Sequence, residues 1–329
     1  MKMNCARHAA FAALLSIPAA AIAQTPPTAP QTTPPWAYAV NPPPVPGGQP
    51  ARDDGSPKRV PGSSVSLLGP QIRDLFNPPD WYPDAHPAMP ESVAHGRKPD
   101  VRACGYCHLP NGQGRPENAS LAGLPAAYIV QQMADYKAGL RKSSEPRMGP
   151  PSLMLTIGKN ANDVEVTSAA EYFASIKPKQ WIRVVETATV PKTKVSGSML
   201  VVEEGGGKEP IGNRIIETAE DLERTELRDS ASGFVAYVPV GSIKKGEALA
   251  MGKAGKTIRC SICHGPDLRG LGRVPSIAGR SPSYIVRQMY DIQNGARNGP
   301  WAQLMKETVA HISVEDMVAI AAYTASRMP

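Results

Sequence analysis

Large aromatic side chains are scarce in this sequence of 329 residues, which has four Phe and an aromatic share of 5%. With so few rings, two cores of ordinary domain size need another source of apolar volume, and a bound cofactor would supply it. The charged share of 20% and the hydrophobic share of 41% exclude a wholly disordered or multi-span membrane chain. At about 100 to 200 residues per domain, the length predicts two or three domains.

Long apolar runs are almost absent as well. The one that stands out begins at Ala9, follows Lys2 and Arg7, and at thirteen residues is shorter than the roughly 20 residues that cross a bilayer. A small-x-small cleavage signal ends at Ala23. The pattern predicts a signal peptide over residues 1–23 and a periplasmic mature chain without an integral membrane span. A permanent N-terminal anchor is the alternative, and the shortness of the run disfavours it.

Cysteine is rare too, with five in the chain, of which cleavage removes Cys5. The other four form two C-x-x-C pairs, and a histidine directly follows each pair. This motif predicts covalent haem c, because the two thiols add to the two vinyl groups and the adjacent histidine ligates the iron. A shared zinc site, a thioredoxin-like pair and simple disulfides fit less well. The predicted attachment and ligand residues are Cys104, Cys107 and His108 in one copy, and Cys260, Cys263 and His264 in the other.

The two motifs belong to an internal repeat. At an offset of 156, Tyr128-Ile-Val-x-Gln-Met in the first copy matches Tyr284-Ile-Val-x-Gln-Met in the second, and the match continues to Arg141 and Arg297. Five extra residues in the first copy then change the offset to 151. Two related units are therefore visible within one chain.

The repeat predicts a mainly α fold of two tandem helical domains joined by a long connector. Capping-box patterns at Asn162 and Ser313 predict the start of the last helix in each unit. Stretches rich in β-branched residues within the connector predict a few strands there. The expected parts after the signal peptide are a Pro-rich flexible or extended spacer (24–80), the first domain (81–178), the connector (179–245) and the second domain (246–329).

Iron that is held by one imidazole needs a sixth ligand, and a thioether is usual where electrons are transferred. Met154 and Met305 both stand 18 residues before a tyrosine of the last helix, and they are the predicted axial ligands. Met148 is an alternative to Met154, because the longer loop of the first copy allows either. The other methionines and histidines that compete are expected to fill cores or to lie at the surface: Met133, Met289, His86, His95 and His311.

These motifs together resemble class I cytochrome c and, in tandem, the soluble diheme cytochromes c of bacteria. The resemblance extends over residues 91–176 and 246–328, and it implies two covalent haem c groups with His and Met axial ligands. Two features depart from that family. The connector is much longer than the usual linker, so close packing of the two haems does not follow from the resemblance. His108 is followed by Leu109, where the second copy keeps the usual glycine.

With both axial positions filled, each iron can only change its oxidation state by one electron. An electron carrier is therefore predicted, with redox proteins as donor and acceptor, among them a periplasmic dehydrogenase or a terminal oxidase. A diheme peroxidase-like enzyme is one alternative, and a cytochrome subunit of a periplasmic dehydrogenase is another. The formal net charge of +7 is not evidence for a nucleic-acid partner. Cleavage of the signal peptide and the four haem propionates reduce the net charge to about +1, so no nucleic-acid partner is predicted.

Overall fold

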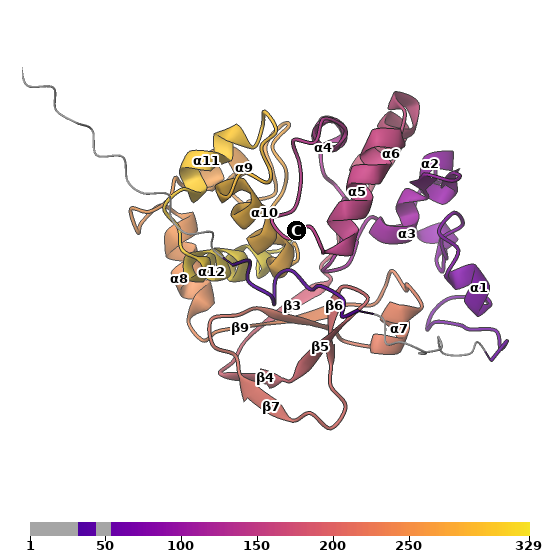
Figure 1. The fold of residues 1–329 in the computed structure, drawn as a ribbon, viewed down its shortest axis with the longest axis horizontal. Coiled ribbons are helices and arrows are strands. Elements are labelled where there is room, and N and C mark those ends of the chain that lie inside the picture. Colours follow the sequence, from indigo (N-terminus) through magenta and orange to yellow (C-terminus); the bar gives the residue numbers. More distant parts are fainter. Residues whose placement is uncertain (1–31, 44–53) are drawn as a thin grey trace, which may run out of the picture. The chain divides into compact units, whose positions relative to one another are not determined.

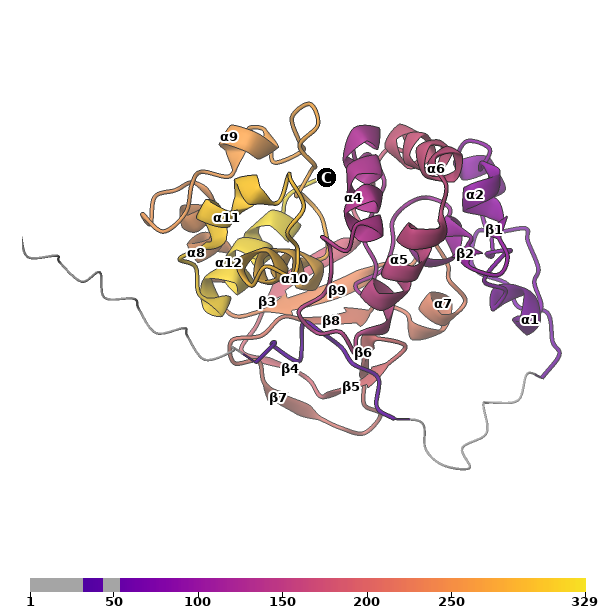
Figure 2. The ribbon, with the colours of Figure 1, turned by 45° about the horizontal axis from the view of Figure 1, so that its top comes forward.

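The computed structural model describes residues 32–43 and 54–329. The predicted signal peptide at residues 1–23, with Cys5, lies outside these residues. Within them the chain forms twelve α-helices, one 3₁₀ helix and nine β-strands (Figure 1). The helices of the two repeats form separate groups, and the larger strands of the connector lie along one side of both groups (Figure 2).

The first repeat is a set of short helices around the Cys104 motif. Helix α6 begins at the predicted capping box, where the Asn162 side chain accepts a hydrogen bond from the Glu165 amide at 2.9 Å and the Glu165 carboxylate accepts one from the Asn162 amide at 2.8 Å. The buried Phe173 of α6 packs in one core with Val93 of α2. Helix α1 (Gly69–Ile72) precedes this repeat. The elements of the repeat are the 3₁₀ helix (Pro83–Ala85), α2 (Glu91–Ala94), β1 (Gly96–Arg97), β2 (Val101–Arg102), α3 (Cys104–His108), α4 (Ala126–Lys137), α5 (Gly149–Asn160) and α6 (Asp163–Ser175).

The second repeat has the same order of helices. Helix α12 starts at the predicted Ser313 capping box, whose reciprocal bonds to Asp316 are both formed. Helices α8 and α12 cross closely at Gly246. A side chain there would collide with the backbone of Ala319, so the approach depends on glycine. The elements are α8 (Ser242–Ala250), α9 (Ser261–His264), α10 (Pro282–Gln293), α11 (Gln303–Val309) and α12 (Val314–Ala325).

The connector contains more β-structure than a mainly α fold implies. Strand β3 (Ile182–Glu186) pairs in parallel with β9 (Phe234–Val238), and β9 pairs in antiparallel with β8 (Ile216–Ala219). These strands bury β-branched and aromatic side chains, which favour sheets. The few strands that the sequence predicted for the connector are present, and the description mainly α holds for the two repeats but only in part for the whole chain. Its other elements are β4 (Thr189–Pro191), β5 (Thr193–Ser196), β6 (Met199–Val202), β7 (Lys208–Pro210) and α7 (Leu222–Glu226).

The described part of the Pro-rich spacer packs against the rest of the chain. The Tyr38 side chain is buried, and its hydroxyl donates to the Asp291 carboxylate at 2.7 Å. The Arg287 guanidinium donates to the Ala37 carbonyl at 2.7 Å. Isolated apolar residues in a stretch without periodicity thus anchor a segment that the sequence predicted to be flexible or extended.

The two repeats also contact each other directly, although the connector is long. Residues 33–329 form one compact unit. At the contact, the amide of Lys142 donates to the Ala296 carbonyl at 2.8 Å and the amide of Asn298 donates to the Leu140 carbonyl at 2.7 Å. The two bonds are equivalent, because the 156-residue offset relates Lys142 to Asn298 and Leu140 to Ala296. In the part of the chain that the structure describes, no helix has the length and apolar character that a membrane crossing requires.

Candidate haem-binding sites

One helical turn in each repeat carries the C-x-x-C-H residues. Both histidines are buried, with 8% of each residue exposed. The Nδ1 atom of His108 bonds to the Ala119 carbonyl at 2.8 Å, and the Nδ1 atom of His264 bonds to the Pro275 carbonyl at 2.8 Å. A carbonyl partner makes Nδ1 the protonated nitrogen, so Nε2 keeps the lone pair that a metal needs. Both imidazoles thus leave Nε2 available to a metal ion.

The Gly-rich loops after the two motifs fold back onto the motif histidines. The amide of Gly114 donates to the His108 carbonyl at 2.9 Å, and the amide of Gly270 donates to the His264 carbonyl at 2.8 Å. Gly114 has a φ of +68°, and a Cβ atom there would lie 2.6 Å from the oxygen of Ala119. That oxygen is the partner of His108 Nδ1, so the glycine is needed for the orientation of the imidazole.

Leu109 takes the backbone conformation that a glycine has in the second repeat. Its φ is +62° and its ψ is 154°, whereas Gly265 has 81° and 160°. A side chain in this region costs on the order of 1 to 3 kcal/mol. The Leu109 side chain is buried, and its packing offsets part of that cost. The departure from the family pattern therefore changes the residue and leaves the turn unchanged.

The titration of these groups suits haem attachment. Burial lowers the pKa of His108 and of His264, so both imidazoles are neutral, as ligation requires. Burial raises the pKa of Cys104 to about 12 and that of Cys260 to about 11. All four cysteines are free thiols. Burial raises the pKa of Cys107 as well, and raised values are the opposite of the low pKa that a dithiol redox enzyme uses.

A cavity of about 470 Å³ lies against the first motif, which is within the range of about 300 to 1,000 Å³ for cofactor sites. Cys104, Cys107 and His108 line it, and Met154 and Met133 line it as well. The structure thus brings Met154 to the predicted site, together with a methionine that was expected to fill a core. Several apolar side chains complete the wall: Leu121, Leu124, Ile129, Ile157 and Phe173.

The remaining predicted residues lie elsewhere. Met148 is fully buried in a core shared with Tyr38 and does not line the cavity. Met305, on α11, is partly buried and packs against the core of the second repeat, to which Met289 also belongs. His86 bonds to Asp80 and to the hydroxyl of Tyr172, and neither His95 nor His311 lines the cavity.

A polar cluster between the repeats was not predicted as a site. The Arg141 guanidinium donates to the Tyr284 hydroxyl at 3.0 Å, and the Arg297 guanidinium donates to the Tyr128 hydroxyl at 2.9 Å. The two bonds are related by the 156-residue offset. Gln132 accepts hydrogen bonds from both arginines at 2.8 Å. The signal for this cluster was the identity of these positions in both copies, away from the haem motif.

One buried arginine atom at the cavity lacks a partner. The Nε atom of Arg115, which lines the cavity, is buried and without a hydrogen-bond partner among the described residues. Arg141 and Arg287 also line the cavity. Buried guanidinium groups need anionic or acceptor partners, and a haem brings two propionates. The cysteine pair, the buried imidazole, the mostly apolar cavity lining and the arginines at the cavity therefore fit haem c.

Comparisons with known proteins found relatives in sequence and in structure. No protein-family model matches the chain. Cytochrome c4 of Azotobacter vinelandii is 27% identical over 244 residues, which cover 73% of this chain and 90% of that protein. The thiosulfate dehydrogenase electron acceptor of Stutzerimonas stutzeri is 38% identical over 82 residues, which cover 25% of this chain and 36% of that protein. A solved structure of Acidithiobacillus ferrooxidans cytochrome c4 superposes with a TM-score of 0.44 at 21% identity, covering 68% of this chain and 98% of that chain.

The relatives confirm the resemblance that the sequence motifs predicted, and with it a diheme electron-transfer cytochrome with two covalently bound haem c groups. The chain is a homologue of the cytochromes c4, which are diheme class I cytochromes c.

Proposed function

We propose that this chain moves single electrons between redox proteins in the periplasm, through two haem c groups with His and Met axial ligands. The observation that carries the proposal is the repeated geometry of the motif. In both copies the Nδ1 atom of a buried histidine donates a hydrogen bond, at 2.8 Å, to a carbonyl eleven residues further along the chain. Two copies of such a site at a fixed offset are typical of a two-centre electron carrier.

The side chains of the first repeat have separate roles in this proposal. Haem c, when bound, supplies a centre that changes its oxidation state by one electron. Cys104 and Cys107 attach it, His108 ligates on one side, and Met154 is the proposed second axial ligand. The lining of the cavity by Met154 supports it over Met148, whose side chain belongs to a different core. The apolar wall excludes water from the site and so favours the less charged, reduced state.

In the second repeat, Cys260 and Cys263 attach the haem, and His264 and Met305 are the proposed axial ligands. Met305 occupies the position in α11 that Met154 occupies in α5, each 18 residues before the tyrosine of the following helix. The same fold order therefore supports the same ligand pair. With both positions taken by side chains, neither repeat offers an open coordination position to a peroxide substrate.

The periplasm is proposed from the signal-peptide pattern at residues 1–23. Haem c attachment is consistent with an exported chain. The described residues do not include this segment.

A second candidate function is that of the cytochrome partner of a dehydrogenase. It is favoured by the thiosulfate dehydrogenase electron acceptor among the relatives and by a further relative, the cytochrome subunit of sulfide dehydrogenase of Chlorobaculum tepidum, which is 42% identical over 41 residues. Stable co-purification with a catalytic subunit from the native host would support this function, and recovery of the chain alone would support a free carrier.

A potentiometric titration followed by optical spectroscopy tests the proposed function. The holoprotein is expected to give two reversible one-electron transitions and no steady consumption of hydrogen peroxide. A single transition, or peroxide turnover coupled to oxidation of a dye, would contradict the assignment as a carrier.

A further inference from the structure

The two C-x-x-C-H faces differ in what covers them. In the first repeat, a segment of the connector that we call the cap (residues 221–233) lies on the face. The side-chain amide of Asn111 donates to the Ser230 carbonyl at 2.7 Å, and the side-chain amide of Gln113 donates to the Ser232 carbonyl at 2.9 Å. The Arg115 guanidinium donates to the carbonyl of Thr225 at 3.3 Å. Three side chains of the haem-motif loop thus bind the backbone of the cap.

Arg228 closes the cap over the motif itself. Its guanidinium lies 3.6 Å from the centre of the Tyr106 ring and donates to the Tyr106 carbonyl at 2.7 Å. Tyr106 stands between the two attachment cysteines. Arg228 has a φ of +58°, which is unfavourable for a residue with a side chain. The strained backbone indicates that the surrounding contacts enforce this position.

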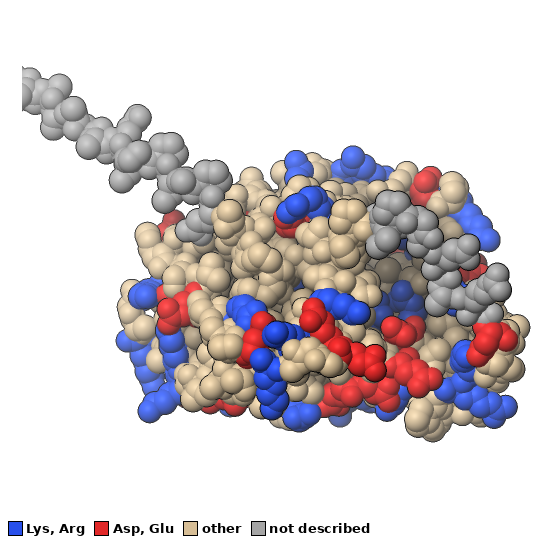
Figure 3. Space-filling model, turned by 60° about the horizontal axis from the view of Figure 1, so that its bottom comes forward, with Lys and Arg blue, Asp and Glu red and all other residues tan. Residues whose placement is uncertain are grey.

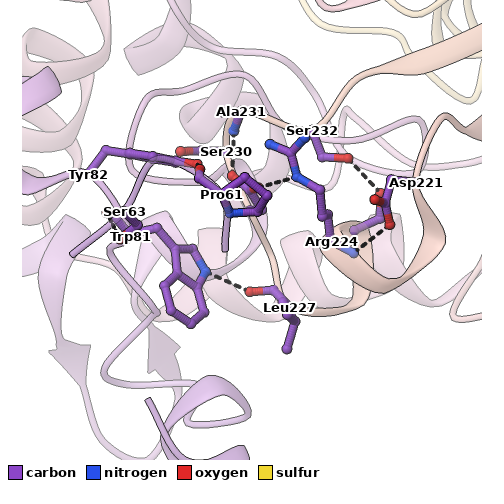
Figure 4. A network of polar contacts seen from close by, with 12 residues as sticks. Pro61, Ser63, Trp81, Tyr82, Asp221, Arg224, Leu227, Ser230, Ala231 and Ser232 are labelled. Atoms are coloured by element: carbon purple, nitrogen blue, oxygen red, sulfur yellow. Dashed lines mark hydrogen bonds and ion pairs between the residues drawn. The ribbon is translucent and has the colours of Figure 1, made fainter. Parts of the chain in front are cut away.

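The N-terminal segment fastens the cap from the other side. The indole of Trp81 is buried and donates to the Leu227 carbonyl at 2.8 Å, as Figure 4 shows. The Asp221 side chain caps α7 by accepting from the Arg224 amide at 3.0 Å (Figure 4). Arg224 also pairs with the buried Asp229 at 2.7 Å. The cap is therefore a fixed part of the fold.

The second repeat has no equivalent cover among the described residues. The 156-residue offset places Ile262 at the position of Tyr106 and Leu271 at the position of Arg115. Ile262 is 64% exposed and Leu271 is 59% exposed. Asp267 and Arg269 replace Asn111 and Gln113 and are exposed too. The four residues of the first haem motif and its loop that bind the cap, Tyr106, Asn111, Gln113 and Arg115, thus have exposed counterparts of different chemistry in the second repeat.

These counterparts lie on one face. In the first repeat, Tyr106 contacts Arg228, Arg115 binds the carbonyl of Thr225 in the same cap, and Glu117 pairs with Arg115. The offset assigns Ile262, Leu271 and Arg273 to the corresponding positions, and Cys263, which adjoins Ile262, is exposed.

The apolar centre of this face has a basic border. The exposed basic residues of the stretch 253–273 are Lys253, Lys256, Arg259, Arg269 and Arg273, and the acidic residue there is Asp267. Lys256 is paired with Asp316, so four cations remain. On the face of the connector, by contrast, basic and acidic side chains are interspersed (Figure 3). We call the surface made by Ile262, Cys263, Leu271, Arg259 and Arg273 the port.

We propose that the port is the docking surface for a one-electron redox protein whose contact face is apolar at its centre and acidic at its border, and that the cap closes the same route to the first repeat. The proposal rests on the proposed function. Exposed apolar side chains beside an attachment cysteine give contact area close to the cofactor, and the basic border steers an acidic partner. In one event, the reduced chain loses one electron and the oxidised partner gains it, and no proton or atom is transferred.

Electron transfer from the reduced holoprotein to copper(II) plastocyanin, an acidic one-electron acceptor, tests the proposal by stopped flow at low ionic strength. The port variant R259E/R273E is compared with K192E/K194E, which makes the same change in net charge on exposed residues of the connector. We expect the second-order rate constant of the port variant to fall at least about tenfold, since steering of this kind contributes roughly 10 to 10³. The control is expected to stay within about twofold of wild type, and high salt is expected to remove the difference.

Equal rate constants for the two variants would overturn the port. A concentration-dependent dimer that I262S/L271S abolishes would also overturn it, by assigning the face to a second copy of the chain. Both results are compatible with two reversible haem transitions in the same samples, in which case the proposed function stands. Loss of those transitions in the wild type would instead overturn the proposed function.

Discussion

The two repeats share the order of their helices, their capping boxes and the geometry of their histidines, and they differ in how their haem-motif faces meet the rest of the chain. Tyr106 of the first repeat lies under Arg228 of the connector, whereas its counterpart Ile262 is exposed. Residues that hold the cofactor are thus kept the same, and residues at the rim have diverged. The comparison teaches that a long connector can make two similar haem-motif faces unequal while the geometry of both histidines stays the same.

The largest expected effect comes from removing one attachment site at a time. Replacing Cys104 and Cys107 by serine, or Cys260 and Cys263 by serine, removes both thioether bonds of one repeat. Each double variant is expected to carry one covalent haem instead of two, as a pyridine haemochrome assay of the purified chain measures. The first-repeat variant is also expected to unfold more readily, because its cavity of about 470 Å³ loses the group that fills it. Two haems in either variant would contradict the assignment of that pair.

Methionine variants sharpen the comparison of the axial ligands. M154L is expected to lower the midpoint potential of one haem by more than about 60 mV, a tenfold change in a one-electron equilibrium. M148L serves as the matched control, because Met148 is fully buried away from the cavity. It is expected to cost less than about 1.5 kcal/mol of stability and to leave both potentials unchanged. A shift in M148L and none in M154L would reverse the assignment, and M305L tests the second haem in the same way.

Opening the cap should make the two repeats more alike. R228A removes a cation–π contact and a hydrogen bond to the Tyr106 carbonyl, and a loss of about 1 to 2 kcal/mol in the free energy of unfolding is expected. Oxidation of the first haem by ferricyanide is expected to become several times faster, since its motif face is uncovered. R183A, which breaks an exposed ion pair with Glu220, is the control and should change neither quantity. An unchanged oxidation rate in R228A would show that the cap does not close this route.

The reciprocal contact between the repeats predicts matched, smaller effects. Y128F and Y284F each remove the hydroxyl that accepts a hydrogen bond from an arginine of the other repeat. Each is expected to lower the free energy of unfolding by about 1 kcal/mol, and the two losses should agree within about 0.5 kcal/mol, as urea denaturation measures. A large loss in one variant only would mean that the contact is not symmetric.

The smallest effect concerns pH and only the first repeat. A hydrogen bond that His86 donates to the Asp80 carboxylate raises the pKa of His86 above its ordinary value of 6.5. The protonated form therefore stabilises the folded chain fully below about pH 6.5, and this stability is lost as the pH rises through the higher pKa of the folded state. Urea unfolding of wild type and H86Q between pH 5 and 9 should show a difference that shrinks with rising pH. A difference that grows with pH would contradict the predicted sign.

Much of the site was predictable from the sequence, because its chemistry depends on local patterns. The C-x-x-C-H motif places both thiols and the imidazole on one helical turn, as α3 and α9 show. The capping boxes at Asn162 and Ser313 fixed the starts of α6 and α12, since their bonds join residues three apart. The family resemblance rested on the same short-range features, and the relatives confirmed it.

Features that depend on contacts between distant residues were not predictable. Burial of Tyr38 requires the carboxylate of Asp291, which follows it by more than 250 residues, and no local pattern in the Pro-rich segment indicates this. The cap depends likewise on carbonyls of residues 225–232, which any sequence presents. Met133 has helical spacing typical of a core residue, and it lines the cavity because the core there surrounds a cofactor site.

Carbon monoxide binding to the fully reduced holoprotein tests most directly whether each iron is closed on both sides by the side chains of this chain. The account predicts that the spectrum of neither haem changes when carbon monoxide is added at neutral pH, while both haems still exchange electrons with a one-electron oxidant. Rapid formation of a carbon monoxide complex at either haem would contradict it, because that iron would then have an open position suited to catalysis.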